Sequence, residues 1–125
     1  MNKPLALIVE DDTKLSNIFS LALEGAGFET EVINDGAEAT ERLAAVQPAV
    51  VVLDLHLPNV SGPAVLQQIK SDRKLADTRV IVATADALMA ESIQASADLV
   101  LLKPISIGQL RDLAARLRPP DTLLD

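Results

Sequence analysis

The chain has 125 residues, of which 49% are hydrophobic, so it is long and apolar enough to fold as one domain with a buried core. It has no cysteine, which excludes disulfides and thiolate metal sites, and its longest apolar run, about five residues, is far short of the roughly 20 that cross a membrane. The net charge is −7 and the 11 lysines and arginines are scattered along the sequence, so we expect a cytoplasmic protein that binds neither membranes nor nucleic acid directly.

Short apolar runs alternate with segments of helical periodicity in the first half of the chain. Leu5–Val9 is the first predicted strand, and the helix after it is expected to end at Gly25 and Gly27. The apolar face of this helix consists of Leu15, Ile18, Phe19, Ala22 and Leu23. A strand over residues 30–33 and a turn at residues 34–36 follow. A second helix stops near Pro48, with Ala39, Leu43 and Val46 inward.

The second half of the chain continues the alternation. Residues 49–53 form a continuous valine-rich run, which suits a parallel strand buried on both faces. A third helix is predicted from Pro63, with Val65, Leu66 and Ile69 inward. Strands over residues 80–83 and Leu99–Leu102 flank a short alanine-rich helix at residues 88–95. The last helix starts at the capping-box sequence SIGQ, and its predicted inward residues are Ile107, Leu110, Leu113 and Leu117.

Five strands and five helices in strict alternation predict an α/β fold with right-handed βαβ units and a parallel sheet. In such a sheet, ligands bind outside the carboxyl ends of the strands. We expect a single domain over residues 1–125, with a core at about residues 4–117 and a short tail at residues 118–125.

Polar residues follow four of the predicted strands, and all would lie on one edge of the sheet. In chain order they are Glu10, Asp11 and Asp12, then Asp54, then Thr84, and finally Lys103. Each is unremarkable alone, because an acid at a strand end is usually a solvated loop residue or a helix cap. Together they would bring up to four carboxylates, a hydroxyl and an ammonium group to one crevice.

This set of groups suits phosphoryl chemistry with a magnesium ion. Like charges about 4 Å apart repel by roughly 4 kcal/mol at an effective dielectric near 20, and a bound cation would offset that repulsion. Carboxylates are ligands that Mg²⁺ prefers, and a carboxylate can also be a nucleophile that forms an aspartyl-phosphate. A lysine and a hydroxyl can hold the phosphoryl oxygens. The acids therefore predict a magnesium site.

The sequence resembles the receiver domains of response regulators in two-component signalling, over about residues 4–117. The motifs IVEDD, VVVLDLHLPNVSG, VIVATA and LLKP occur in this order at suitable spacing, and as a set they are highly specific. The resemblance implies a flavodoxin-like, doubly wound sheet of strand order 2-1-3-4-5 with five helices, and a cis bond before Pro104. Because only eight residues follow Leu117, we expect a stand-alone receiver or a part of a longer chain.

By position, the resemblance implies that Asp54 accepts a phosphoryl group from a sensor histidine kinase or a phosphotransfer protein. Asp11 would ligate Mg²⁺ directly and Glu10 mainly through a bound water, and the backbone carbonyl of His56 would complete the protein ligands. Asp12 falls one place later, where solvation or capping of the first helix is the better interpretation, although it could also tune the site.

Thr84 would bind a phosphoryl oxygen and Lys103 would pair with the phosphate. His56 follows the acceptor by two residues and Asp86 follows Thr84 by two, so these side chains would face each other at positions that often tune dephosphorylation in the family. His56 is otherwise expected to be an exposed loop residue. The protein would not be an enzyme beyond catalysing its own phosphorylation and dephosphorylation.

The sequence departs from the family around the fourth predicted helix. Val100 stands at the switch position, where relatives carry a rotating Tyr or Phe. The sixteen residues from Thr84 to Val100 are about three fewer than usual and include no Lys or Arg. These departures argue against an aromatic switch and against a charge-paired dimer. We expect a downstream protein to bind the face of the fourth helix, fifth strand and fifth helix, including Leu88, Met89 and Ile93.

Three other functions compete with this interpretation. A phosphatase with an aspartyl-phosphate intermediate needs a second Asp where this chain has His56. A flavodoxin needs a loop rich in hydroxyls and glycine after the first strand, where three acids would repel the flavin phosphate. A receiver-like interaction module that works without phosphorylation stays open because of the shortened fourth-helix region.

Overall fold

Five parallel strands form one sheet in the computed structural model, which describes residues 3–120. Their spatial order is β2-β1-β3-β4-β5, as the resemblance implied. The strands are β1 (Leu5–Val9), β2 (Glu29–Ile33), β3 (Val50–Leu53), β4 (Arg79–Thr84) and β5 (Leu99–Leu102). Because all five run the same way, their carboxyl ends share one edge of the sheet and their amino ends the opposite edge.

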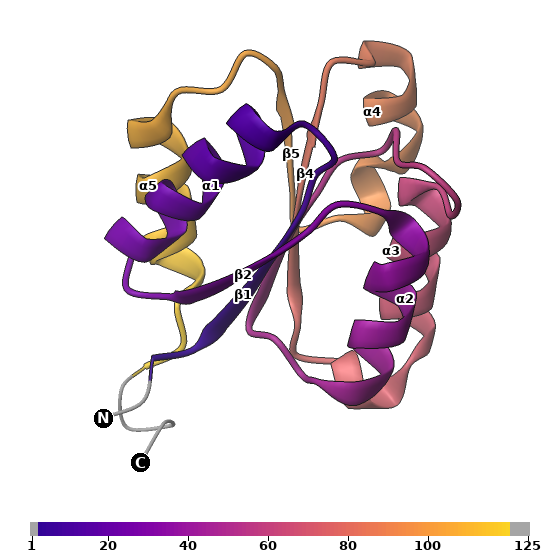
Figure 1. Ribbon diagram of the computed structural model, residues 1–125, viewed down its shortest axis with the longest axis horizontal. Helices are drawn as coiled ribbons and strands as arrows, with labels where there is room; N and C mark the ends of the chain where they lie inside the picture. The colour runs from indigo at the N-terminus through magenta and orange to yellow at the C-terminus, as the bar shows by residue number, and fades with distance from the viewer. Residues whose placement is uncertain (1–2, 121–125) are drawn as a thin grey trace.

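Helices cover both faces of the sheet (Figure 1). On one face lie α1 (Thr13–Gly25) and α5 (Ile107–Leu117), and on the other α2 (Gly36–Ala45), α3 (Gly62–Ser71) and α4 (Ala87–Ile93). Two short 3₁₀ helices, η1 (Arg73–Leu75) and η2 (Gln94–Ser96), follow α3 and α4. The arrangement confirms the doubly wound, flavodoxin-like α/β fold. The Lys103–Pro104 bond is cis, also as expected.

Successive residues of the central strands pack into two different cores. In β3, Val51 and Leu53 pack in the core that includes Leu43 of α2, whereas Val50 and Val52 pack in the core under α1 and α5. Both faces of the strand are therefore buried, which explains why its sequence is continuously apolar instead of alternating. Full burial of each such side chain stabilises the fold by roughly 1.5–3 kcal/mol.

Two residues that were predicted to face inward are exposed, Ile18 at 38% and Ile107 at 45%. The buried stripe of α1 runs through Phe19, Ala22 and Leu23, and Ile18 precedes Phe19 by one position, about 100° around the helix. Ile107 is the first residue of α5 and projects partly into solvent. The helical period predicted the buried faces of α1 and α5 correctly, but it did not predict where each buried face ends.

Two helix ends also refine the prediction. Gly27 has a φ of 97°, a left-handed conformation that glycine adopts at little cost, and it follows the end of α1. Helix α2 ends at Ala45, so Val46 lies just past the helix, although its side chain still packs against the core. Helix α4, in the region that the sequence predicts to be shortened, has 7 residues.

Candidate functional site

Three carboxylates meet at the carboxyl edge of the sheet. Glu10 follows β1 and is 1% exposed, Asp54 follows β3 and is 7% exposed, and Asp11 is open to solvent. One oxygen of each lies within 4.8 Å of the others. Neighbouring strands hold them there, because the Asp54 N–H donates to the Val9 carbonyl (3.0 Å) and the Glu10 N–H to that of Ile33 (3.0 Å). The predicted meeting of these acids is confirmed.

Lys103 reaches the acids from the end of β5. Its Nζ donates to Glu10 Oε1 at 2.7 Å and lies 3.7 Å from Asp54 Oδ1. Its backbone N–H donates to the Thr84 carbonyl (2.8 Å), which ties the lysine to the end of β4. Burial raises the pKa of Glu10, and the hydrogen bond from Lys103 opposes that rise. The lysine thus neutralises part of the negative charge gathered at this edge.

Thr84 and the start of α4 are joined by hydrogen bonds. Thr84 is fully buried, and its Oγ1 accepts from the Asp86 N–H at 3.1 Å. Asp86 caps α4, with Oδ1 accepting from the Met89 N–H at 3.0 Å, and its Oδ2 lies 3.1 Å from His56 Nε2. The bond from Met89, and then the contact with His56, lower the pKa of Asp86. His56 and Asp86 therefore face each other, as their positions implied. Apart from this contact, the His56 side chain is exposed.

Asp12 belongs to the start of α1. Its Oδ1 accepts from the Leu15 N–H at 3.0 Å, which makes it the N-cap of the helix, and its own N–H donates to Glu10 Oε2 at 3.2 Å. Capping was the preferred interpretation of this residue from the sequence, and it is confirmed.

Val100, at the switch position, is half-buried on β5. Together with Met89 and Ile93 of α4 it packs against the core on the α2–α3 side of the sheet. The side chain is therefore part of the packing beneath α4.

The fold agrees with a comparison against known families. A family model described as the response regulator receiver domain matches residues 6–115, most of the chain. The chain belongs to the response-regulator receiver family. Members of this family share the fold described above and take part in two-component signalling.

Known relatives of this receiver include regulators that are about twice as long. It is 34% identical over 124 residues to the DNA-binding dual master transcriptional regulator RpaA of Synechocystis sp., an alignment that covers 96% of this chain and 52% of the relative. It is 30% identical to the DNA-binding response regulator MtrA of Mycobacterium tuberculosis, over 90% of this chain and 48% of the relative. The receiver spans about half the length of these curated relatives.

Among solved structures, the receiver domain of Francisella response regulator 1452 superposes with a TM-score of 0.79 at 26% identity, covering 91% of this chain and 95% of that one. Its fold is thus that of an established receiver. Within residues 3–120, we find no helix with the length and apolar character needed to span a bilayer.

Two glycines, at the starts of α2 and α3, shape the loop after Asp54, although neither was assigned a role in packing from the sequence. A Cβ on Gly62 would collide with the Asp54 carbonyl oxygen, and one on Gly36 with that of Val60. The Gly62 N–H donates to the Leu55 carbonyl (3.0 Å), so the start of α3 lies directly against the end of β3. In the sequence, the only indication was a glycine at the first position of α2 and of α3. The close approach of the backbones themselves depends on the tertiary fold.

The carboxylates of the receiver fit a magnesium ion by their chemistry. Glu10, Asp11 and Asp54 offer hard oxygen ligands, which Mg²⁺ prefers over nitrogen and sulfur. Asp11 is exposed, so the cluster is open to the waters that Mg²⁺ usually retains. The cluster also lacks a full set of protein ligands, which is the ordinary situation for this ion.

Proposed function

We propose that the chain accepts a phosphoryl group on Asp54 from a sensor histidine kinase or a phosphotransfer protein, in a Mg²⁺-dependent reaction. Phosphorylation then changes how the domain binds a downstream protein. The observation that carries this proposal is the gathering of Asp54, two further acids, the Lys103 ammonium and the Thr84 hydroxyl at one edge of the sheet. The protein acts on itself and is not an enzyme with a separate substrate, and we expect it in the cytoplasm.

The hydrogen bonds of the crevice favour Asp54 as the nucleophile. Both oxygens of Glu10 are engaged, one by Lys103 and the other by the Asp12 N–H. Among residues 3–120, the Asp54 carboxylate accepts no hydrogen bond and has only the 3.7 Å ion pair with Lys103. An oxygen of Asp54 is therefore free to attack, whereas attack by Glu10 would first break two contacts.

In the transfer, an Asp54 oxygen bonds to phosphorus as the N–P bond of the donor phosphohistidine breaks, and the departing imidazole nitrogen takes up a proton. Asp11, Asp54 and the His56 carbonyl would hold Mg²⁺, with Glu10 acting through water, and the ion supplies positive charge against the phosphoryl oxygens. Lys103 pairs with one phosphoryl oxygen, which its position 3.7 Å from Asp54 supports. Thr84 donates its hydroxyl proton to another.

The downstream partner binds the face formed by α4, β5 and the start of α5. Support comes from exposed apolar side chains on all three elements, Leu88 at 81%, Leu102 at 52% and Ile107 at 45%. The named relatives are DNA-binding regulators, but this chain covers only about half of each. We keep the expectation that residues 3–120 do not themselves bind nucleic acid, because the net charge of the chain is −7.

Intact-mass spectrometry with acetyl phosphate tests the proposal. The parent should gain one phosphoryl group in the presence of Mg²⁺ and none with EDTA, and Asp54→Asn should gain none. Asp12→Asn is the matched control, because asparagine preserves the helix cap and this variant should be labelled like the parent. Labelling of Asp54→Asn equal to that of the parent would disprove the assignment and favour an interaction module that works without phosphorylation of Asp54.

A further inference from the structure

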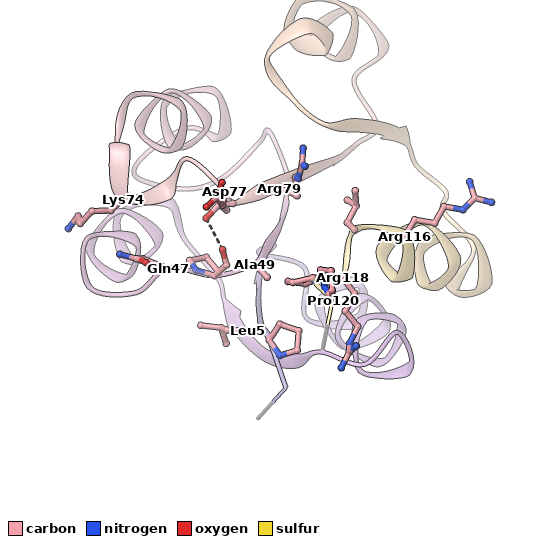
Figure 2. Close-up of a pocket in the computed structure, with 14 residues that line it drawn as sticks. Leu5, Gln47, Ala49, Lys74, Asp77, Arg79, Arg116, Arg118 and Pro120 are labelled. Atoms are coloured by element: carbon pink, nitrogen blue, oxygen red, sulfur yellow. Dashed lines mark hydrogen bonds between the residues drawn. The ribbon is translucent and has the colours of Figure 1, made fainter. Parts of the chain in front are cut away.

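A hollow lies at the amino edge of the sheet, at the opposite end from the three carboxylates (Figure 2). It has a volume of about 580 Å³ and is bounded by Leu5, Ala49 and Arg79, which stand at or next to the starts of β1, β3 and β4, and by Leu117 at the end of α5. We call it the basal groove. A hollow of this size is in the range of ligand-binding sites.

The basal groove gathers positive charge in a protein that is acidic overall. Four basic side chains line it, Lys74, Arg79, Arg116 and Arg118, and Asp77 is the one carboxylate among the described lining residues. These are four of the 11 basic residues of a chain with net charge −7. Four of the basic residues that looked scattered in the sequence therefore lie around one hollow, away from the acidic crevice.

Two of these cations have no carboxylate partner in the part of the chain that the structure describes. Within residues 3–120, neither Lys74 nor Arg116 has a carboxylate partner within 4.0 Å. Among the described residues, Lys74 Nζ donates to the Ala44 carbonyl alone, at 3.3 Å, and a carbonyl does not neutralise its charge. Arg79 pairs with Asp98 at 3.2 Å, but its side chain is 59% exposed. A ligand that brings anionic groups would supply what these side chains lack.

The arrangement of the cations indicates the shape of that ligand. Lys74 and Arg116 stand on opposite sides of the hollow with Arg79 between them, and the charged ends of all three extend outward, so the cations are spaced along the rim of the groove and do not converge on one point. A single phosphate could not reach all three, whereas an extended chain with spaced carboxylates could. Leu5, Ala49 and neighbouring prolines supply apolar surface for side chains between the acids.

We propose that the basal groove binds an extended segment of a partner protein in which acidic residues alternate with leucine-like residues. A nucleic acid is disfavoured, because no aromatic side chain lines the groove for base stacking and the rest of the molecule repels phosphates. Complementary charge would speed the encounter and fix the register, and apolar contacts would add affinity. This docking site is separate from the face that phosphorylation controls.

The test uses a fluorescent peptide of alternating Asp and Leu, and the same peptide with Asn in place of Asp. Fluorescence anisotropy should detect the acidic peptide and not its Asn counterpart, with weaker binding as salt is raised. Amide NMR shifts should change at Leu5, Ala49, Arg79 and Leu117. Binding of the Asn peptide with equal affinity, or shifts confined to another face, would overturn the proposal.

Charge reversal supplies the matched comparison. Lys74→Glu with Arg116→Glu should weaken binding of the acidic peptide about tenfold or more, a loss of roughly 1.4 kcal/mol. Lys14→Glu with Arg111→Glu makes the same change in net charge on α1 and α5 outside the groove, and should bind like the parent. An equal loss in this control pair would show general electrostatic attraction and reject the site.

Two further measurements keep the test decisive. The milder Lys74→Gln with Arg116→Gln pair must show the same direction of change, which covers the case that charge reversal disturbs folding. Acetyl-phosphate labelling of the groove variants should equal that of the parent, because the groove lies at the opposite edge of the sheet. Tighter binding of a single-stranded oligonucleotide than of the acidic peptide would reject a protein partner.

Discussion

At the scale of single residues, the contact between Glu10 and Lys103 governs the electrostatics of the site. The Glu10 side chain is almost completely buried, and a buried carboxylate without a partner is costly. Lys103 Nζ, at 2.7 Å, supplies the compensating charge, yet burial still leaves the pKa of Glu10 raised. We therefore expect Lys103 to stabilise the unphosphorylated fold, in addition to its proposed pairing with phosphate.

We predict that Lys103→Met destabilises the metal-free protein at neutral pH by about 1–3 kcal/mol, the usual cost of a buried polar group left unsatisfied. The loss should shrink on acidification. A carboxyl group whose folded pKa is raised binds its proton more readily in the folded state, so stability recovers as the pH falls from that raised value toward 4.5. Urea denaturation at a series of pH values measures this.

Lys14→Met is the control for the lysine prediction, because Lys14 is exposed on α1 and has no carboxylate partner within 4.0 Å among residues 3–120. It should leave stability nearly unchanged at every pH. If the two variants behave alike, the Glu10–Lys103 contact contributes nothing beyond a general change in charge.

At the scale of elements, every α-helix begins at a side chain that accepts a hydrogen bond from the backbone of its first turn. These N-caps are Asp12, Asp35, Ser61, Asp86 and Ser106. Each lies in a loop that follows a strand, at the carboxyl edge of the sheet. Two of these caps have a second role, because the Asp12 N–H donates to Glu10 and the Asp86 N–H to Thr84 in the site.

Asp35 makes this capping dependent on pH. Its Oδ1 accepts from the Glu38 N–H at 2.8 Å, and its Oδ2 accepts from Asn59 Nδ2 at 3.0 Å. The bond from Glu38, and then that from Asn59, lower the pKa of Asp35 below 3.8. A carboxyl group with a lowered folded pKa stabilises the fold above 3.8, and this contribution is lost as the pH falls through the folded value.

We therefore predict that Asp35→Ser makes the acid dependence of stability shallower. Serine caps helices about as well as aspartate but does not titrate in this range, so stability near neutral pH should change little. Below pH 3.8 the parent should lose stability more steeply than the variant, as measured by urea midpoints. The control is Asp77→Ser, which removes one exposed carboxylate that accepts no hydrogen bond from residues 3–120. If stability depends on pH in this variant as it does in Asp35→Ser, the helix cap does not explain the effect.

At the scale of the whole molecule, the structure suggests how a signal would leave the site. The Thr84 hydroxyl oxygen accepts from the Asp86 N–H, and Asp86 starts α4. If phosphorylation of Asp54 draws the Thr84 hydroxyl inward, the bond to Asp86 is strained and the start of α4 must shift. Val100 is stiff and carries no hydroxyl, so it offers no rotating polar group of the kind expected at this position.

We predict that beryllofluoride, a mimic of the acyl phosphate, changes hydrogen exchange at residues 84–90 and leaves β5 nearly unchanged. A ligand shifts a conformational equilibrium only through contacts that differ between the states, and those contacts lie at Thr84 and not at Val100. Asp54→Asn should show no response. Altered protection in Leu99–Leu102 beside an unchanged 84–90 segment would refute this route.

The elements, the family and the meeting of the acids followed from the sequence alone. Apolar runs buried on both faces mark parallel strands, and parallel strands bring the residues that follow them to one edge, so Glu10, Asp11 and Asp54 were predictable neighbours. Such inferences depend on local periodicity, which marks the strands, and on the strand order that the resemblance implied.

Other features were decided only by how separate elements approach one another. The exposure of Ile18 and Ile107 depends on where each helix leaves the sheet, and the need for glycine at Gly62 depends on the backbone of β3 lying against α3. The basal groove draws Lys74 and Arg79 from η1 and β4, and Arg116 from the end of α5, 37 residues beyond Arg79 in the chain. Local patterns do not encode such long-range packing, because each contact depends on the placement of two or more elements at once.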